Sequence, residues 1–251
     1  MKKINFFKKI IYLLSLSPLI FIFDYFKFKK ISKKFRDDRF NYSITKIKPC
    51  LRDKTLATSF DRHYIFHTAW AARVVSRIKP KFHIDISSSL YFCSIVSAFM
   101  PIEFYDYRPV RLRLSGLKDS HADLNSLPFR DESIHSLSCM HVIEHIGLGR
   151  YGDPINPVGD VNAASELSRV LAQNGSLIVV LPVGKPTIVF NAHRIYSYNQ
   201  VLSMFNDLEL VEFSLIPDEH NDNGIIENAD SNIVANQVYG CGLFLFTKKK
   251  K

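Results

Sequence analysis

The body of the chain alternates short apolar runs with segments whose apolar residues recur at helical spacing. From Phe60 to Ile78 the apolar side chains recur every three or four positions, which predicts an amphipathic helix that Pro80 ends. Further strands and helices follow in alternation. The remaining predicted helices are Leu90–Phe99, Val161–Leu171 (with Asn174-Gly175 as its C-terminal cap) and Tyr198–Phe205.

Seven apolar runs have the length and composition of strands. They are His83–Ile86, Ile102–Tyr105, Leu117–Ala122, Ile134–Met140, Ser176–Leu181, Leu208–Leu215 and Gly242–Thr247. The run SLIVVL is apolar without interruption, which is typical of a strand buried on both faces. Strands that alternate with helices predict an α/β fold with a doubly wound, mainly parallel seven-stranded sheet.

The first thirty residues follow a different pattern. The apolar run Ile10–Phe23 lies between two groups of lysines, and as a helix it would reach roughly 21 Å, short of the ~30 Å hydrocarbon core. No small-residue cleavage site follows, which argues against a signal peptide. Pro18 would kink the helix and turn it back. We therefore expect residues 1–30 to associate with a membrane in its plane or as a re-entrant segment, on the cytoplasmic face.

Two alternatives for this segment stay open. A tilted, spanning anchor would include Phe6, Phe7, Tyr25 and Phe26, and a third possibility is a helix packed on the domain. Residues 31–56 are polar and without a pattern, and are predicted to be a linker. Residues 57–247 form the predicted domain and residues 248–251 a basic tail.

The distribution of charge argues against a nucleic-acid partner. The net charge is +9, but residues 1–36 alone carry +9 and the four C-terminal lysines carry +4. The rest of the chain is therefore mildly acidic, at −4. A nucleic-acid-binding domain would carry its positive patch on the folded body. The four cysteines form no C-x-x-C pair, so neither a disulfide framework nor a zinc ribbon is indicated, and a reducing compartment fits.

Acidic residues stand at the ends of three successive predicted strands: Asp85, Asp106 and Asp123. Asp106 follows Asp85 by 21 residues, about the spacing at which a nucleoside-binding sheet places the carboxylate that accepts from ribose hydroxyls. Each acid also has a structural interpretation. Asp85 would cap the following helix, Asp106 would pair with Arg108, and Asp123 would organise a turn with Asn125.

The stretch ADLNSLPFRDESIHSLSCMHVIEHI resembles the class I S-adenosylmethionine-dependent methyltransferases, in which an acid precedes a Leu-Pro-Phe turn, a strand and a Glu-His pair. SELSRVLAQNGSLIVVLPVGKP resembles the helix, glycine turn and fifth strand of the same superfamily. The segments DYRP, GRYGDPINPVGD, FNAHRIYS and CGLF resemble a domain family of unknown function within it. The resemblance covers roughly two thirds of the chain.

The resemblance implies that S-adenosylmethionine is the cofactor. It implies that Asp106 holds the ribose, that Asp123 and the Leu124 amide meet adenine, and that Asp85 and the turn after it face the methionine portion. The sequence departs from the superfamily in that turn, which is usually rich in glycine. Here it reads Asp85-Ile-Ser-Ser-Ser-Leu, and Ser87 stands where a glycine is expected.

Three histidines are candidates for the base that takes a proton from a hydroxyl acceptor: His145, His141 and His193. His145 also has a purely structural interpretation. His141, Glu144 and His145 match the H-x-x-E-H peptidase motif, but the glycines that follow are unlike a regular helix, and we predict no metal centre. Tyr151 and Asp153 lie in a Gly/Pro-rich loop that would form either a lid or an ordinary connection, and Arg194 is a candidate for binding an anionic substrate.

Two functions follow from these observations. The first is methyl transfer from S-adenosylmethionine to a small or lipid-linked acceptor, for example a glycan hydroxyl. The second is a non-catalytic protein that keeps the methyltransferase fold and acts as a membrane-associated binding or assembly partner. The serine-only turn favours the second function, whereas Asp106, Asp123 and His145 favour the first. The sequence does not identify the acceptor or the oligomeric state.

Overall fold

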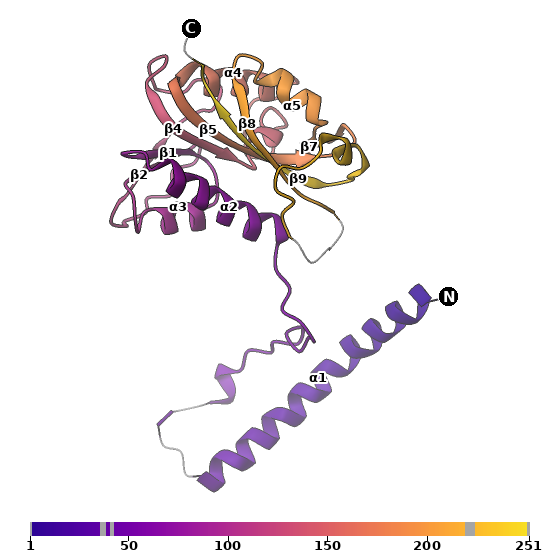
Figure 1. Cartoon of the computed structure of the whole chain (residues 1–251). Helices are drawn as coiled ribbons and strands as arrows, with labels where there is room; N and C mark the ends of the chain where they lie inside the picture. The colour runs from indigo at the N-terminus through magenta and orange to yellow at the C-terminus, as the bar shows by residue number, and fades with distance from the viewer. Residues whose placement is uncertain (1, 36–38, 41–42, 219–223, 250–251) are drawn as a thin grey trace. The chain divides into compact units, whose positions relative to one another are not determined.

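The computed structural model describes residues 2–35, 39–40, 43–218 and 224–249, and for residues 2–15 it describes the backbone alone (Figure 1). The chain divides into two compact units, Met1–Phe60 and Asp61–Lys251. Each unit is described by itself.

The first unit consists of one long helix and an irregular segment. Helix α1 (Lys2–Phe35) continues without interruption past Pro18. We predicted that the chain would turn back at this proline, and it does not. The predicted linker therefore begins only after Phe35, and it contains a short 3-10 helix, η1 (Ile44–Lys46). Among the described residues, no helix combines the length and the apolar character needed to cross a bilayer.

The second unit is built around a seven-stranded sheet in the order β3-β2-β1-β4-β5-β9-β8, in which only β9 is antiparallel to its neighbours. This confirms the predicted fold class. The strands are β1 (His83–Ile86), β2 (Ile102–Asp106), β3 (Leu117–His121), β4 (Ile134–Met140), β5 (Leu171–Val183), β8 (Glu209–Ile216) and β9 (Gly240–Thr247). The order of the parallel strands reverses between β1 and β4, and such a switch point is where open α/β sheets bind ligands.

Helices cover both faces of the sheet (Figure 1). On one face α2 (Arg62–Ile78) and α3 (Leu90–Val96) bury Trp70, Val74 and Phe92 against the strands. On the other face α4 (Gly159–Val170) and α5 (Tyr198–Met204) bury Leu167 and Val201. Because apolar residues of β4 and β5 point to both faces, the central strands lie between two cores, as the SLIVVL pattern predicted.

The end of α4 differs from the prediction. The helix ends at Val170, and Leu171 already has extended backbone angles and begins β5. Asn174 has a φ of 57°, and a Cβ on Gly175 would come within 2.8 Å of the Ala172 carbonyl oxygen. Asn174-Gly175 is therefore a bend inside β5, beside an irregularity in its pairing with β4, and it is not a helix cap.

Several short elements have no counterpart in the sequence prediction. The strands β6 (Thr187–Val189) and β7 (His193–Ile195) form a separate hairpin. The 3-10 helices η2 (Ile143–His145) and η3 (Ser231–Asn236) are each only three to six residues long. Elements this short carry too few residues for a periodic pattern to appear.

Candidate functional site

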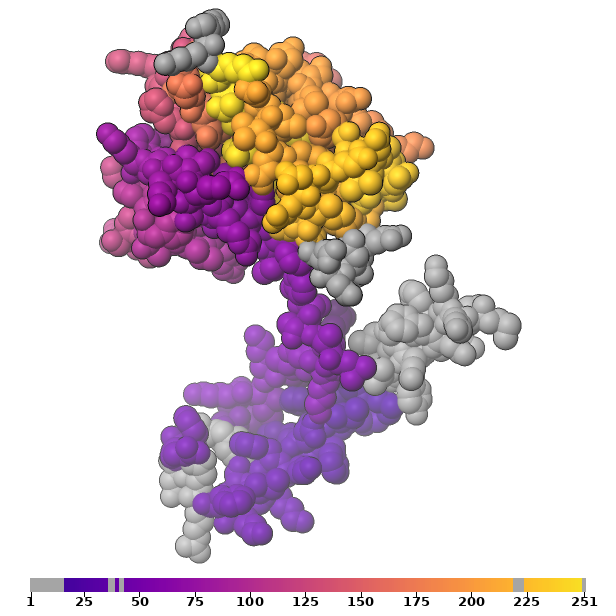
Figure 2. Space-filling model, viewed as in Figure 1, coloured from indigo at the N-terminus to yellow at the C-terminus, as the bar shows by residue number. Residues whose placement is uncertain are grey.

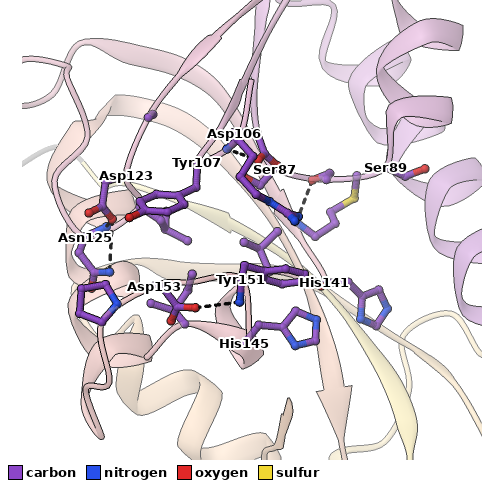
Figure 3. Close-up of a pocket in the computed structure, with 18 of the residues that line it drawn as sticks. Ser87, Ser89, Asp106, Tyr107, Asp123, Asn125, His141, His145, Tyr151 and Asp153 are labelled. Atoms are coloured by element: carbon purple, nitrogen blue, oxygen red, sulfur yellow. Dashed lines mark hydrogen bonds between the residues drawn. The ribbon is translucent and has the colours of Figure 1, made fainter. Parts of the chain in front are cut away.

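A cavity of about 860 Å³, open solvent at its mouth included, lies at the carboxyl ends of β1, β2 and β4 (Figure 3). Its walls come from Ser87–Ser89 after β1, from Asp106–Arg108 at the end of β2 and from Ala122–Asn125 after β3. The remaining wall is formed by Met140–Val142, His145, Ile146, Tyr151, Asp153, Pro154 and Tyr64. Cavities of this size suit small molecules and cofactors.

The serine turn after β1 adopts the backbone conformation expected of a glycine. Ser87 has a φ of 57°, a left-handed conformation that costs a non-glycine residue about 1–2 kcal/mol. Two hydrogen bonds hold it there, because the Ser87 backbone N–H and Oγ both donate to the Tyr105 carbonyl oxygen, at 2.7 and 3.1 Å. Ser88 Oγ accepts from the Met140 backbone N–H at 2.9 Å. The turn thus follows the path of a glycine-rich turn without containing a glycine.

Asp85 does not line the cavity, contrary to the role that the resemblance implied. Its side chain is fully buried, and its carboxylate accepts hydrogen bonds from the Ser88 backbone N–H at 3.1 Å, from Cys93 Sγ at 3.4 Å and from Ser138 Oγ. Burial raises the pKa of Asp85 to about 6. Asp85 therefore stabilises the serine turn from the buried side. This is close to the alternative that Asp85 caps the helix after the turn, because it accepts from the Ser88 backbone N–H just before α3.

A buried histidine extends this network under the turn. His83 Nδ1 lies 2.7 Å from Ser136 Oγ, and His83 Nε2 lies 2.8 Å from Ser138 Oγ. Since Ser138 Oγ donates to Asp85, it accepts from Nε2–H, and Nδ1 then accepts from Ser136. Burial lowers the pKa of His83 to about 3, so the ring is neutral at physiological pH.

Asp106 lies at the end of β2 and faces the cavity (Figure 3). Its Oδ1 accepts from the Arg108 backbone N–H at 2.7 Å, and within the described part of the chain its Oδ2 has no hydrogen-bond partner. The ion pair expected between Asp106 and Arg108 does not form, because the Arg108 guanidinium lies over the ring of Tyr151, 4.4 Å from its centroid. One carboxylate oxygen is thus left for a ligand.

Asp123 and Leu124 form the neighbouring wall. Asp123 Oδ1 accepts from the Asn125 backbone N–H at 2.9 Å, so the carboxylate does organise the turn that follows it. The Leu124 side chain is buried, and its backbone N–H makes no hydrogen bond to any described residue. That N–H and the second oxygen of Asp123 are the groups that a nucleobase would meet.

His145 belongs to η2 and lines the cavity. Its Nδ1 lies 2.6 Å from the Ala192 carbonyl oxygen, which only accepts, so Nδ1 carries the proton and Nε2 keeps a lone pair. Burial lowers the pKa of His145, so the ring is neutral at pH 7. Nε2 lies 3.8 Å from Glu144 Oε1, beyond hydrogen-bond distance. His145 thus has the protonation state that a general base needs.

His141 also lines the cavity, but both of its ring nitrogens are already engaged. Nδ1 lies 2.8 Å from Glu144 Oε1, and Nε2 lies 3.5 Å from Cys241 Sγ. Burial opposes a charge on this ring, but Cys241 and Glu144 outweigh it and raise the pKa of His141 to about 10. His141 is therefore poorly suited to accept a proton from a substrate. In the H-x-x-E-H motif, His141 directly follows β4 and Glu144 and His145 lie within the single turn of η2, so the two histidines do not share a helix face.

Two residues predicted to act in the site have other positions. His193 on β7 does not line the cavity, and its ring lies against Tyr239 with centroids 4.9 Å apart. Arg194 is buried, and its guanidinium donates to the Ile146 carbonyl oxygen at 2.7 Å. It holds the loop after η2 in place and is not available to an anionic substrate.

The loop that follows η2 closes one side of the cavity. Asp153 Oδ2 accepts from the Gly147 backbone N–H at 2.7 Å, and Asp153 Oδ1 accepts from the Tyr151 backbone N–H at 3.2 Å. The Tyr151 ring meets His145 edge-on at 5.7 Å and Arg108 through its face. Through Tyr151 the loop therefore bridges His145 after β4 and Arg108 after β2, as a lid over the cavity would.

Sequence reasoning missed the contribution of α2 and β9. Tyr64 on α2 lines the cavity and stacks on His141, with centroids 5.5 Å apart. His63, His67 and Cys241 lie behind it. The spacing of His63 and His67, four residues apart on a predicted helix, places both on one face and was the available signal.

Comparisons with known proteins agree with this architecture. A family described as "Caenorhabditis protein of unknown function, DUF268" matches residues 113–228, a little under half of the chain. The N-methyltransferase NodS of Bradyrhizobium japonicum, crystallised with S-adenosyl-L-homocysteine, aligns over 80% of this chain and 92% of its own, with a TM-score of 0.52 and 12% identity. The chain has the class I methyltransferase fold.

Two other solved structures show the same fold. A candidate sarcosine dimethylglycine methyltransferase from Galdieria sulphuraria is 11% identical, over 73% of this chain and 85% of its own, with a TM-score of 0.52. The third is a chain from the complex of the Haloferax volcanii Trm112 methyltransferase activator with a candidate methyltransferase. It is 16% identical, over 76% of this chain and 92% of its own, with a TM-score of 0.51. No curated protein matches the sequence.

Proposed function

We propose that this chain binds S-adenosylmethionine in the cavity and transfers its methyl group to a hydroxyl oxygen of a small or lipid-linked acceptor, such as a glycan. The observation that carries the proposal is that Asp106, Asp123 and the serine turn line one cavity at the switch point of a methyltransferase-fold sheet. NodS, which has this fold, was crystallised with the demethylated cofactor.

The groups around the cavity fit the cofactor. Asp106 Oδ2 would accept from the ribose hydroxyls, and the Leu124 N–H with Asp123 would meet adenine. The Ser87 side chain adds only Cβ and Oγ relative to a glycine, and Oγ is bonded to the Tyr105 carbonyl oxygen. Ser89 lines the same space, and no hydrogen bond of its side chain is found in the described part of the chain.

His145 is the residue that we assign as the base. When bound, S-adenosylmethionine supplies an electrophilic methyl group. His145 Nε2 would take the proton of the acceptor hydroxyl, while Nδ1–H stays hydrogen-bonded to the Ala192 carbonyl oxygen and stabilises the imidazolium. Tyr151 and its loop would exclude water from the same end of the cavity.

Binding of the cofactor is tested by calorimetric titration of Asp106→Ala with S-adenosylmethionine. Removing the carboxylate leaves the ribose hydroxyls without their acceptor, which costs about 1–3 kcal/mol, or roughly 5- to 150-fold in affinity. Glu103→Gln is the matched control, since Glu103 lies on the same strand, pairs with Lys118 and does not line the cavity. Unchanged affinity in a folded Asp106→Ala protein would contradict the assignment.

We also propose that residues 1–30 hold the protein at the cytoplasmic face of a membrane. Apolar side chains of α1, among them Leu19, Phe23 and Phe26, are exposed within the first unit, and lysines follow them directly. An amphipathic helix with basic residues binds an anionic membrane surface in its plane.

Deletion of residues 1–35 tests the membrane proposal, because the helix ends at Phe35 and the second unit begins only at Asp61. The truncated protein is expected to stay folded by circular dichroism and to lose its sedimentation with anionic vesicles. Undiminished sedimentation would show that the anchor lies elsewhere.

A further inference from the structure

Histidine and cysteine side chains converge beside the cavity from three separate elements. His63 comes from α2, His141 follows β4, and Cys241 begins β9. One ligand atom from each lies within 4.8 Å of the other two. Figure 2 shows α2, in purple, and the chain near the C-terminus, in yellow, side by side on the face in view. The rings of His63 and Tyr239 stack with their centroids 5.2 Å apart. The three donors are thus brought together by the tertiary fold alone.

The separation of two donors matches a shared metal ion. His141 Nε2 and Cys241 Sγ are 3.5 Å apart. A tetrahedral zinc ion with Zn–N of about 2.0–2.1 Å and Zn–S of about 2.3 Å places its nitrogen and sulfur ligands roughly 3.5 Å apart. A side-chain shift of about 1 Å at His63, which is only half-buried at the start of α2, would bring its nitrogen to the same distance.

A carboxylate orients His141 in the way that metal-binding histidines need. Nδ1 of His141 donates to Glu144 Oε1 at 2.8 Å, which leaves Nε2 to face Cys241. Glu144 is almost fully buried, and its Oε2 has no partner among the described residues. A carboxylate that receives the second N–H of a ligating histidine is a recurring feature of zinc sites. Glu144 would also balance the charge of the ion.

A further buried histidine, His67, lies beside the three donors but is not one of them. It is fully buried one turn after His63, and its Nδ1 lies 2.6 Å from the His63 carbonyl oxygen, which fixes the proton on Nδ1. Its Nε2 is therefore an acceptor, and it is buried without a partner in the described structure. The His67 ring meets the His141 ring edge-on, with centroids 5.0 Å apart. The His67 ring therefore packs against His141 and supports its position, while its own lone pair is not among the proposed ligands.

We propose that His63, His141 and Cys241 bind a Zn²⁺ ion, with Glu144 as the outer-shell partner. One thiolate with two imidazoles favours zinc over magnesium or calcium, which prefer oxygen ligands. On binding, the Cys241 thiol and Nε2 of the protonated His141 ring each give a proton to solvent, and the sulfur and the freed nitrogen bond to the metal. The ion would tie α2 to the ends of β4 and β9. Because His141 also lines the cavity, the ion would shape the acceptor side of the site. This replaces our expectation that the chain holds no metal.

The test is metal binding by the purified full chain in the absence of S-adenosylmethionine. Elemental analysis is expected to find about one Zn²⁺ per chain. Cobalt substitution should give a thiolate-to-cobalt charge-transfer absorption in the near ultraviolet. Cys241→Ser is expected to abolish that absorption, and His63→Gln to lose the metal. Glu144→Gln should weaken zinc binding by about 10- to 100-fold, the usual effect of removing an outer-shell partner.

Two variants serve as matched controls. His193→Gln changes a histidine of the same aromatic cluster that is not among the ligand atoms, and Cys50→Ser removes the exposed cysteine. Both are expected to keep the metal. A folded wild-type protein that binds neither Zn²⁺ nor Co²⁺ at micromolar concentration would overturn the proposal, as would an unchanged cobalt spectrum in Cys241→Ser. Because no cofactor is present in this experiment, either result leaves the test of cofactor binding at Asp106 unaffected.

Discussion

The two sides of the cavity are assembled in different ways. The side formed by Ser87–Ser89, Asp106 and Asp123 uses the ends of β1, β2 and the segment after β3, which follow one another in the chain. The other side is formed by Tyr64 of α2 and by residues after β4, and the cluster directly behind it joins α2, β4 and β9 through residues up to 178 positions apart (His63 to Cys241). The first side can be recognised in a sequence because its spacing is local. The second exists only when the sheet has formed and α2 has packed on it.

The two sides also differ in how their polar groups are satisfied. Under the serine turn, His83, Ser138 and Asp85 form a closed network with Ser136 and Ser88. On the histidine side, His67 Nε2 and Glu144 Oε2 are buried without a partner among the described residues. A satisfied network makes a rigid support, whereas buried polar groups without partners raise the free energy of the folded state.

The largest effect on activity is expected from a substitution of His145, which we assign as the base and which does not hold the cofactor. His145→Gln should lower the rate of methyl transfer by about 10²- to 10⁴-fold, the usual contribution of a general base. The affinity for S-adenosylmethionine should stay unchanged, because Asp106 and the serine turn are intact. The measurement is incorporation of labelled methyl groups into a membrane extract that contains lipid-linked glycans. His193→Gln is the control, since His193 lies outside the cavity. A His145→Gln protein as active as wild type would remove His145 from the mechanism.

A smaller effect is expected when the pH is lowered, because the buried network of His83, Ser138 and Asp85 under the serine turn then contributes less to the stability of the fold. The pKa of His83 is about 3 in the folded protein against 6.5 for an exposed histidine, so its contribution to stability is present above pH 6.5 and is lost as the pH falls toward 3. The wild type should therefore be more stable than His83→Gln at pH 7, and the difference should narrow below pH 6.5 by at most about 1.4 kcal/mol per pH unit. Denaturant unfolding of both proteins at several pH values measures this difference. A constant difference from pH 7 to pH 4 would contradict the burial of a neutral His83.

Much of the fold was accessible from the sequence, because the central strands are uninterrupted apolar runs and the helices between them are amphipathic. β1 and β4 have the predicted bounds. Asp85 was assigned to the cofactor because a strand-end carboxylate looks the same in sequence whether it faces a cavity or the core. His193 was placed in the site because the β6–β7 hairpin, which carries it away from the cavity, is too short to leave a pattern. The burial of a side chain and the position of a short hairpin are decided by tertiary packing.

The helix cap predicted at Asn174-Gly175 was wrong for a related reason. Asn-Gly favours a positive φ, and Asn174 does adopt one. Local propensity alone does not decide whether such a bend ends a helix or interrupts a strand. In this chain α4 ends at Val170, and pairing of Leu171 with Ile134 of β4 extends the strand back to that residue.

The central claim is that a turn without glycine still receives S-adenosylmethionine, because Ser87 already has the backbone conformation of a glycine. The most direct measurement is a paired calorimetric titration of wild type and Ser87→Gly with S-adenosylmethionine and S-adenosylhomocysteine. Wild type is expected to bind both ligands. Ser87→Gly should change the affinity by less than about tenfold, or about 1.4 kcal/mol, because the positive φ and the hydrogen bond from Ser87 Oγ to Tyr105 are already present before the ligand binds and so affect the free and bound protein alike. If neither protein binds either ligand while both are folded, the chain has the methyltransferase fold without its activity, and the proposed function is wrong.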